Sequence, residues 1–543
     1  MSRTPLFAAL RRSLRLARAA NHLPVPTEEL LERAARAAGA RREPPPVPPA
    51  ARSLSRRGFL AAGGAAIGAA ACAPRRSAAT APRAADEPVI IVGAGVAGLT
   101  AAWRLRQAGI PVRLYEAQDR TGGRMLSLRG HFADGQVAEL GGELIDTGHA
   151  TIRALALELG IPLDDLARDD PSLAQIVWHF DGAPRTDAAL VDGFRPLAAQ
   201  IERDLVAVGV DDITWRTPGR AAALDRMTIA EWLGRAGATG WVRRVVEVGY
   251  TTEFGLEPDE QSALNLLTMI GTGDAFEIFG ESDERFHVRG GNDLIVAALA
   301  DRMADAIHRG TLLEAVRTRA DGRFECSLRR GATSFTAAAP QVVLALPFTL
   351  LRHVSLDVDL PPAKRRAIAE LGYGTNAKLM VGFSERRWRT AHRSNGSVLA
   401  DLPFQLTWET SRLQPGASGI LTNFTGGRHG IEIGAGSPAQ QAFRLVGGLE
   451  RVFEGIAATR AGMTEARFHW PSHAYTRGSY ASYLPGQWTG IRGAEGEPVG
   501  RLHFVGEHCS LAAQGFMEGG CETGAAAASA VAAVRGRRLP AAG

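Results

Sequence analysis

The pattern of apolar and polar positions becomes regular after residue 85. Residues 88–92 form a short run rich in β-branched side chains and bounded by Pro and Gly, which is typical of a buried parallel strand. Residues 99–107 have a helical pattern, and residues 112–115 form a second apolar run that ends at Glu116. This order of strand, turn, helix and strand predicts the first unit of an α/β domain with a parallel sheet.

A glycine-rich turn joins the first predicted strand to the helix. Gly93, Gly95 and Gly98 have the spacing G-x-G-x-x-G, and Glu116 follows 23 residues after Gly93. In a dinucleotide-binding unit these glycines permit a tight turn, a close approach of backbone N–H groups to a pyrophosphate, and close packing of helix on strand, while the acid accepts the ribose hydroxyls. The residues expected to bind the nucleotide here are Gly93, Gly95, Val96, Ala97, Gly98, Glu116 and Ala117.

Two further elements indicate FAD rather than NAD. Gly122, Gly123 and Arg124 resemble the extended fingerprint of FAD-binding oxidases of the glutathione-reductase type, in which the arginine neutralises pyrophosphate charge. Near the C-terminus, residues 502–505 have the pattern of a strand, and an Ala-rich helix extends to residue 533. A second helix N-terminus can therefore face the other end of the cofactor, and the residues expected there are Gly506, Glu507, Gly515, Phe516 and Met517.

The two nucleotide-facing elements lie roughly 400 residues apart. We therefore predict a discontinuous FAD-binding Rossmann-like domain of the glutathione-reductase type, with an inserted α+β substrate-binding domain. A ligand pocket is expected between the two domains. The expected boundaries are 1–75 for a leader, 76–85 for a linker, 86–150, 285–346 and 470–538 for the FAD-binding domain, and 151–284 and 347–469 for the substrate-binding domain.

Composition and charge exclude several classes of protein. The chain has 543 residues and a formal net charge of +5, but residues 1–85 hold 15 Arg and 4 Glu, a charge of +11. The remaining 458 residues therefore carry −6, which argues against a nucleic-acid binder. Apolar runs are too short for a stable membrane span. The four Cys form no C-x-x-C motif, and we expect neither a disulfide framework nor a metal site.

The basic N-terminal segment resembles a twin-arginine export signal, because Arg56 and Arg57 precede a short, weakly apolar run. This predicts export of the folded protein by the twin-arginine machinery to the periplasm or the outside of the cell. The alternative is an Arg pair that arose by chance in an Arg-rich chain. Lipid anchoring at Cys72 is not favoured, because Ala69 stands where lipoprotein signals usually have Leu.

From residue 86 onward the series of motifs resembles the flavin-containing amine oxidases, a family that includes monoamine, polyamine and L-amino-acid oxidases. The resemblance implies that Gly141, Gly142 and Glu143 lie at the flavin, and that the backbone of Val316 contacts adenine. The motifs that carry it are, in chain order, the Gly93 turn, Gly122-Gly123-Arg124, Glu139-Leu-Gly141-Gly142, Thr311 to Val316, Val342 to Pro347, the Lys378 segment with Trp388, Trp470, Gly478-Ser479-Tyr480 and Gly515 to Gly519.

The resemblance also implies three catalytic residues. Lys378, one of only two lysines in the chain, would hold a water near flavin N5. Tyr480 and Phe516 would flank the substrate amine in front of the flavin ring, orient it and keep the site dry. Covalently flavinylated relatives have Cys where this chain has Ser479, and a hydroxyl provides no thiolate, so FAD is expected to be non-covalent.

The expected activity is therefore FAD-dependent oxidation of an amine, with hydride transfer to flavin N5, hydrolysis of the imine to aldehyde and ammonia, and reduction of O2 to H2O2. Many L-amino-acid oxidases carry Met-Arg soon after the Glu-Leu-Gly segment, whereas this chain has Glu143-Leu144-Ile145, which favours an amine over an α-amino acid. Glu143 is open to two interpretations, a contact to the second ammonium of a diamine or a structural carboxylate. The alternatives are an L-amino-acid oxidase, a related FAD-dependent desaturase or dehydrogenase, and an exported binding protein without turnover. The sequence also leaves open whether the chain forms a homodimer.

Overall fold

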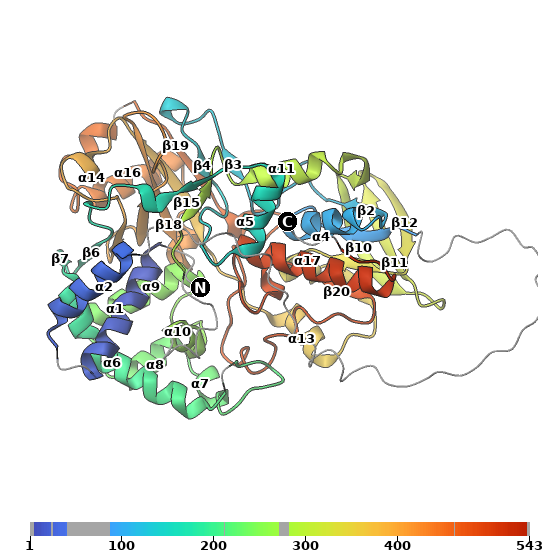
Figure 1. Ribbon diagram of the computed structural model, residues 1–543, viewed down its shortest axis with the longest axis horizontal. Helices are drawn as coiled ribbons and strands as arrows, with labels where there is room; N and C mark the ends of the chain where they lie inside the picture. The colour runs from blue at the N-terminus through green and yellow to red at the C-terminus, as the bar shows by residue number, and fades with distance from the viewer. Residues whose placement is uncertain are drawn as a thin grey trace, which may run out of the picture.

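A computed structural model describes residues 5–22, 25–40, 87–210, 212–270, 282–460 and 462–539. Two regions lie side by side in Figure 1, one built around a parallel sheet and one around a larger mixed sheet. The elements that build each region come from several separate stretches of the chain. The fold is thus α/β with a second sheet domain, as predicted.

The first region contains a five-stranded parallel sheet with β1 at its centre. The expected strands are present, and Ile91 of β1 pairs with Val343 on one side and Leu114 on the other. Parallel strands buried on both faces account for the β-branched runs in the sequence. The strand order is β20 (Leu502–Phe504), β13 (Val342–Leu344), β1 (Val89–Val92), β2 (Val112–Tyr115) and β9 (Ile307–His308).

Two helices from opposite ends of this region pack directly on each other (Figure 1). They are α4 (Val96–Gln107) and α17 (Met517–Val534). The contact is close because Gly524 of α17 meets the backbone of α4, where a Cβ at Gly524 would lie 2.3 Å from the Ala97 carbonyl oxygen. Helix α4 begins at Val96 rather than at residue 99, so its first turn follows directly on Gly95. The helices α5 (Ala150–Leu159) and α11 (Asp293–Asp301) also belong to this region.

A four-stranded sheet extends the first region. Its order is β12 (Thr333–Ala339), β11 (Phe324–Arg330), β10 (Thr311–Thr318) and β14 (Ser355–Asp357). Between β13 and β14 lies α12 (Phe348–Leu351), and α13 (Pro362–Glu370) follows. Small pairs add β3 (Ser127–Leu128) with β4 (Ala138–Glu139), and β5 (Leu163–Asp165) with β8 (Phe286–Val288).

The second region contains a seven-stranded sheet whose central strands are buried along their whole length. Helices α14 (Arg387–Thr390), α15 (Gly427–Glu432) and α16 (Pro438–Leu449) belong to this region. The strand order is β19 (Glu465–Phe468), β15 (Ala377–Phe383), β18 (Gly419–Thr425), β17 (Leu406–Glu409), β16 (Val398–Ala400), β6 (Val177–Phe180) and β7 (Ala183–Arg185). Lys378 lies on β15, in the interior of the molecule.

A helical layer completes the second region. It is formed by α6 (Asp187–Val208), α7 (Ala222–Asp225), α8 (Ile229–Arg235), α9 (Gly240–Phe254) and α10 (Ala263–Ile270). Two N-terminal helices, α1 (Pro5–His22) and α2 (Thr27–Ala40), pack against α6. Leu14 and Ala17 of α1 are fully buried in the same apolar core as the inner face of α6.

The N-terminal helices are also held by polar contacts. The Arg18 guanidinium forms an ion pair with Glu202 at 2.9 Å, and the Thr27 hydroxyl donates to Asp192 at 2.7 Å. Helices α1 and α2, which belong to the predicted leader, are therefore packed on the second region. Arg56, Arg57 and Cys72, on which the export prediction depends, lie outside the described residues. Within the described ranges, no helix combines the length and the apolar character that crossing a bilayer requires.

Candidate active site

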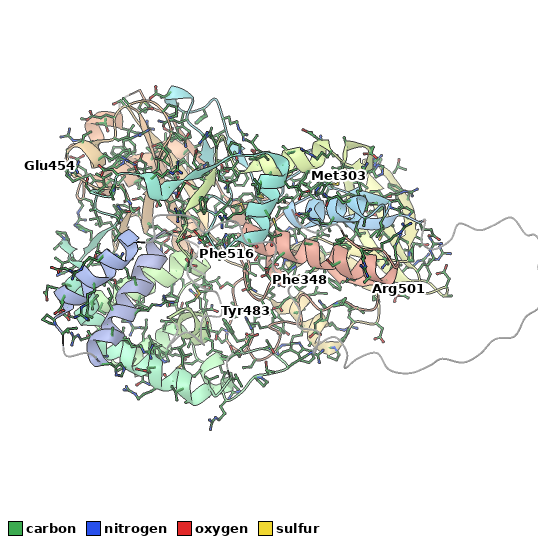
Figure 2. The ribbon with its side chains drawn as sticks, in the orientation of Figure 1. Met303, Phe348, Glu454, Tyr483, Arg501 and Phe516 are labelled. Carbon is green, nitrogen blue, oxygen red and sulfur yellow. The ribbon has the colours of Figure 1, made fainter. Side chains whose placement is uncertain are left out.

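A cavity of about 530 Å³ lies where the two regions meet. It is lined by residues from β1, α4, β2, β10, β15 and the start of α17, among other segments. All the predicted site residues line this cavity except Gly98 and Val316. Figure 2 shows Phe516 near the centre of the molecule, where the two regions meet. The two ends of the chain thus contribute to one site, as the discontinuous domain requires.

The glycine-rich turn forms one end of the cavity. Gly93 has φ +102°, and a Cβ there would lie 2.5 Å from the Ala345 carbonyl oxygen. A Cβ at Gly98 would lie 2.0 Å from the Gly93 carbonyl oxygen, so Gly98 lies outside the cavity lining and serves the packing of helix on strand. Gly95 is different, because a Cβ there would meet no atom within 4 Å. The first turn of α4 receives no side-chain cap. Its backbone N–H groups therefore suit a pyrophosphate.

Glu116 sits where the nucleotide ribose is expected. Its carboxylate accepts from the backbone N–H of Ala94 at 2.7 Å and of Gln118 at 2.8 Å. Burial raises the pKa of Glu116, and these backbone N–H groups oppose the shift. Val316 is fully buried in the protein core and does not line the cavity; the residues of β10 that do are Thr311, Leu312 and Leu313.

Arg124 joins the two distant glycine elements. Its guanidinium donates to Glu507 at 2.7 Å and to the Ser479 carbonyl oxygen at 2.8 Å. The other oxygen of Glu507 accepts from the Gly515 N–H at 2.8 Å. Arg124 is therefore already neutralised by a carboxylate, and it holds the C-terminal turn in place across the cavity.

Lys378 and Glu143 form a buried ion pair at the deep end of the cavity. The Lys378 ammonium lies 2.6 Å from Oε2 of Glu143 and also donates to the carbonyl oxygens of Glu139 and Gly141, at 3.2 and 2.9 Å. An ammonium has three N–H donors, and all three have acceptors within the protein. Lys378 can therefore hold a water near the flavin, as expected from the sequence, only if one of these three hydrogen bonds breaks.

Glu143 is fully partnered. Its Oε1 accepts from the Trp408 indole N–H at 2.9 Å and from the Thr410 hydroxyl at 2.8 Å. Burial alone would raise the pKa of Glu143, but the Lys378 ammonium and the Trp408 N–H bring it below its ordinary value. Of the two interpretations of Glu143, the contacts favour the structural carboxylate.

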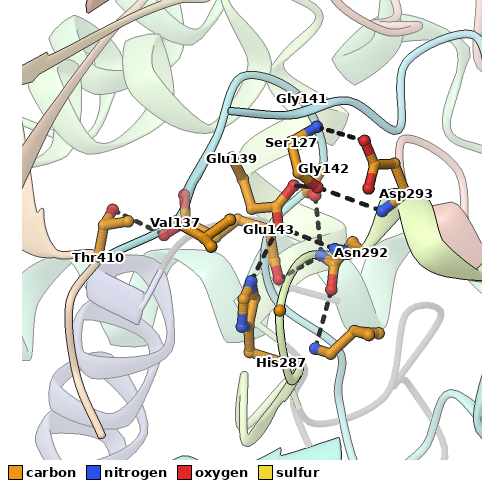
Figure 3. Close-up of polar contacts among 12 residues, drawn as sticks. Ser127, Val137, Glu139, Gly141, Gly142, Glu143, His287, Asn292, Asp293 and Thr410 are labelled. Atoms are coloured by element: carbon orange, nitrogen blue, oxygen red, sulfur yellow. Dashed lines mark hydrogen bonds and ion pairs between the residues drawn. The ribbon is translucent and has the colours of Figure 1, made fainter. Parts of the chain in front are cut away.

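The segment from Glu139 to Glu143 is fixed from its other side by residues that the sequence motifs do not include. The Asn292 amide donates to the carbonyl oxygens of Gly142 and Glu143, at 2.9 and 2.7 Å. The Glu139 carboxylate accepts from Ser127 and contacts His287, at 2.8 and 3.0 Å. Figure 3 shows these side chains around the segment.

The aromatic pair lines the same cavity. The Tyr480 hydroxyl donates to the Glu253 carbonyl oxygen at 2.7 Å. Phe516, which precedes the first turn of α17, packs edge-on against His149 with ring centroids 4.9 Å apart. Met517 packs on Gly142, where a Cβ would lie 2.8 Å from its side chain. Tyr480 and Phe516 are thus each held by a contact within the protein and both line the cavity.

Ser479 is not available for a covalent bond to the cofactor. Its hydroxyl donates to the Asn376 amide oxygen at 2.7 Å, and its side chain is buried. Cys509, which follows Gly506 and Glu507 in the chain, has its pKa raised by burial, and its thiol donates to the Glu495 carbonyl oxygen. No cluster of His, Cys, Asp and Glu suited to a metal ion occurs in the described ranges.

Comparison with known proteins agrees with this geometry. The family model for flavin-containing amine oxidoreductases matches residues 96–532. AofH of Mycobacterium tuberculosis, provisionally named a flavin-containing monoamine oxidase, is 29% identical over 82% of this chain and 96% of its own length. An L-amino acid dehydrogenase of Synechocystis is 25% identical over 81% of this chain and 94% of its own. The structure of cyclohexylamine oxidase from Brevibacterium oxydans covers 82% of this chain and 98% of its own at 23% identity, with a TM-score of 0.72.

Proposed function

Because the chain belongs to the family of flavin-containing amine oxidoreductases, we propose that it oxidises a primary amine that lacks an α-carboxylate, with O2 as electron acceptor and non-covalent FAD as cofactor. The residues that would hold FAD are those of the Gly93 turn, the uncapped first turn of α4, Glu116 and the Gly515 turn. They fit the cofactor because Gly95 leaves open space beside free backbone N–H groups.

The observation that carries the amine assignment is the charge of the cavity wall. An α-amino acid needs a cation to bind its carboxylate, and Arg is the usual one. Two of the three Lys and Arg side chains that line the described cavity, the buried Lys378 and the half-buried Arg124, each face a carboxylate, at 2.6 and 2.7 Å. The third lining cation, Arg477, is exposed and donates to His353.

When bound, FAD supplies the two-electron acceptor for the hydride that leaves the amine α-carbon, and O2 takes up the electrons with release of H2O2. The protein's own residues bind and orient the substrate. Tyr480 and Phe516 present aromatic faces to an amine and exclude water. The Lys378–Glu143 pair fixes the Glu139–Glu143 segment, and Arg124 fixes the Gly515 turn. Water then hydrolyses the substrate iminium to an aldehyde and ammonia.

The test is anaerobic mixing of the purified yellow protein with primary amines and, separately, with L-amino acids. We expect amines to bleach the visible flavin absorbance and L-amino acids to leave it unchanged. Bleaching by L-amino acids alone would instead identify the protein as an L-amino-acid oxidase. A protein that binds flavin but is bleached by neither class contradicts the proposal.

We also propose export through the twin-arginine route, on the strength of Arg56 and Arg57 ahead of a weakly apolar run. Cell fractionation should then recover the protein outside the cytoplasm. Replacing both arginines with Lys should retain it inside, and unchanged distribution would contradict export by this route.

A further inference from the structure

Glu284 is a buried carboxylate in the cavity wall without a partner. It lies on the segment that precedes β8, and Phe286 of β8 exchanges backbone hydrogen bonds of 2.8 Å with Ile145 in both directions. Glu284 is one of the residues that line the cavity, and it is 5% exposed. Neither of its carboxylate oxygens has a hydrogen-bond partner among the described residues.

This arrangement is costly for the protein. When it is ionised, a buried carboxylate without a partner loses its hydration and gains nothing in return, which costs several kcal/mol and favours the protonated form. Glu284 also has φ +46°, a left-handed conformation that non-glycine residues rarely adopt. Other carboxylates of the same wall are satisfied: Glu143 accepts from three side-chain donors, and Glu116 accepts from the backbone N–H groups of Ala94 and Gln118. Glu284 is therefore the acid of this cavity that still needs a donor.

The charged groups around Glu284 favour a donor that is positively charged. Burial raises the pKa of Glu284 well above its ordinary value, and the neighbouring charges of Asp146, Glu253 and Asp283 raise it further, while Arg412 opposes the shift. Three of the four charged neighbours are thus acidic. A cation bound here would relieve this repulsion, whereas an anion would add to it.

Glu284 is linked to both aromatic residues of the site through neighbouring residues, two on the Phe516 side and one on the Tyr480 side. Its backbone N–H donates to Asp146 at 2.8 Å, and the Asp146 carboxylate lies 3.3 Å from His149, which packs against Phe516. On the other side, Glu253 acts electrostatically on Glu284 and accepts the Tyr480 hydroxyl through its carbonyl oxygen. The unpartnered acid and the aromatic pair therefore belong to one chamber.

The chemistry of the reaction decides which nitrogen Glu284 can bind. Hydride leaves the α-carbon only when the adjacent nitrogen has a free lone pair to support the developing iminium. A carboxylate that binds an ammonium stabilises its protonated form, and such contact would suppress oxidation at that nitrogen. The cation that Glu284 receives must therefore be one that keeps its charge throughout turnover.

We propose that Glu284 binds a second, charged nitrogen of the substrate, so that the preferred substrates are aliphatic diamines of which one nitrogen reacts and the other remains an ammonium. This inference rests on the proposed function, since it names the substrate class of the same site. Glu284 rather than Glu143 would then bind the second nitrogen of the diamine. The Glu143 oxygens already accept hydrogen bonds from Lys378, Trp408 and Thr410.

The experiment compares 1,5-diaminopentane with pentylamine, which differ only in the second nitrogen, on the FAD-loaded full chain. The wild-type protein should prefer the diamine. Glu284→Gln should reduce kcat/KM for the diamine about 10- to 100-fold, the range for loss of one charge-assisted hydrogen bond. The loss should appear in KM, and the values for pentylamine should be unchanged or improved. Glu260→Gln, the same substitution at an exposed position, is the matched control and should affect neither substrate.

A second measurement does not depend on turnover. Under anaerobic conditions the diamine should raise the Tm of the wild-type protein and of Glu260→Gln but not that of Glu284→Gln. The Tm of Glu284→Gln without ligand should equal or exceed that of the wild type, because a buried carboxyl group without a hydrogen-bond partner has been replaced by a neutral amide of similar size. If Glu284→Gln lowers activity equally for both substrates, or if the wild type prefers pentylamine, Glu284 does not have this role. If neither amine reduces the flavin, the proposed function itself fails.

Discussion

The ammonium of Lys378 lies 2.6 Å from the Glu143 carboxylate, and both side chains are about 95% buried. The two residues come from different regions of the fold, Lys378 from β15 and Glu143 from the segment after β4. The ion pair therefore joins the larger mixed sheet to the wall of the cofactor cavity, at the contact between the two regions.

Breaking this ion pair should strongly lower the free energy of unfolding. Lys378→Met leaves the Glu143 charge buried without its cation, and we expect the free energy of unfolding to fall by about 3–5 kcal/mol. Glu143→Leu should cost a similar amount, because it leaves the ammonium uncompensated. The double variant Lys378→Met/Glu143→Leu should be more stable than either single variant. Denaturant unfolding in a double-mutant cycle measures the coupling, and additive effects would show that the pair contributes nothing beyond its separate contacts.

Two glycines of the cofactor domain should respond differently to alanine. At Gly95 a Cβ meets no protein atom within 4 Å, so Gly95→Ala should fold with unchanged Tm yet bind FAD at least about tenfold more weakly. At Gly524 a Cβ would lie 2.3 Å from the Ala97 carbonyl oxygen, so Gly524→Ala should lower the free energy of unfolding by about 1–3 kcal/mol. Flavin content from visible absorbance and Tm of the flavin-free protein separate the two effects. Full flavin content in Gly95→Ala would place the pyrophosphate elsewhere.

These glycines also show what the sequence could predict. The Gly93 turn, Glu116 and the C-terminal Gly515 turn are local patterns, and the structure brings them together around one cavity as expected. The start of α4 was predicted three residues too late, because residues 96–98 were assigned to the turn although they already form the first helical turn beyond Gly95.

The sequence contains no local pattern for the residues whose roles depend on tertiary contacts. Asn292 stands at the start of α11, where such a residue suggests a helix cap, but its side-chain amide donates to the Gly142 and Glu143 carbonyl oxygens instead. Glu284 belongs to no motif, and it reaches the cavity only because its segment pairs with Ile145. Both positions depend on contacts between segments at least 138 residues apart, which no local pattern encodes.

The buried pair Asp146 and His149 predicts a specific dependence of stability on pH. Burial raises the pKa of Asp146 to about 7 and lowers the pKa of His149 to about 4. The contribution of Asp146 is present at low pH and is lost as pH rises through 7. The contribution of His149 is present above its ordinary pKa of 6.5 and is lost as pH falls through 4. Between pH 4 and 6.5 the two slopes oppose each other.

Removing either residue should therefore change the pH dependence of stability relative to the wild type. Between about pH 4 and 6.5 the free energy of unfolding of Asp146→Asn, minus that of the wild type, should rise by roughly 3 kcal/mol. For His149→Gln this difference should fall over the same interval. Urea unfolding of the wild type and both variants at a series of pH values measures these differences, and differences of equal sign in the two variants would contradict the assignment.

The FAD is expected to leave the protein on denaturation. Ser479 cannot form a thioether, so acid precipitation of the loaded protein should release the flavin to the supernatant. In Ser479→Cys a thiol replaces the hydroxyl that donates to Asn376, and some flavin should then remain with the pellet. Flavin retained by the wild-type pellet would show a covalent bond at another residue.

The N-terminal helices should contribute to stability. Leu14 is 1% exposed and packs in the same core as α6. Leu14→Ala should therefore lower the free energy of unfolding by about 2–4 kcal/mol. The control is Glu32→Ala on α2, where the side chain is 73% exposed and its ion pair with Arg36 is weak, so the change should stay within about 0.5 kcal/mol. Equal stability of Leu14→Ala and the wild type would mean that α1 does not stay packed on α6 in solution.

The packing of α17 on α4 has a consequence for biosynthesis. The Gly93 turn and α4 leave the ribosome long before the Gly515 turn and α17, which lie far downstream in the chain. Domains generally fold as units as the chain emerges, and this one lacks a wall of its cavity until α17 has been translated. The nascent polypeptide therefore has no closed flavin site before that helix emerges, and loading of the cofactor waits for its synthesis.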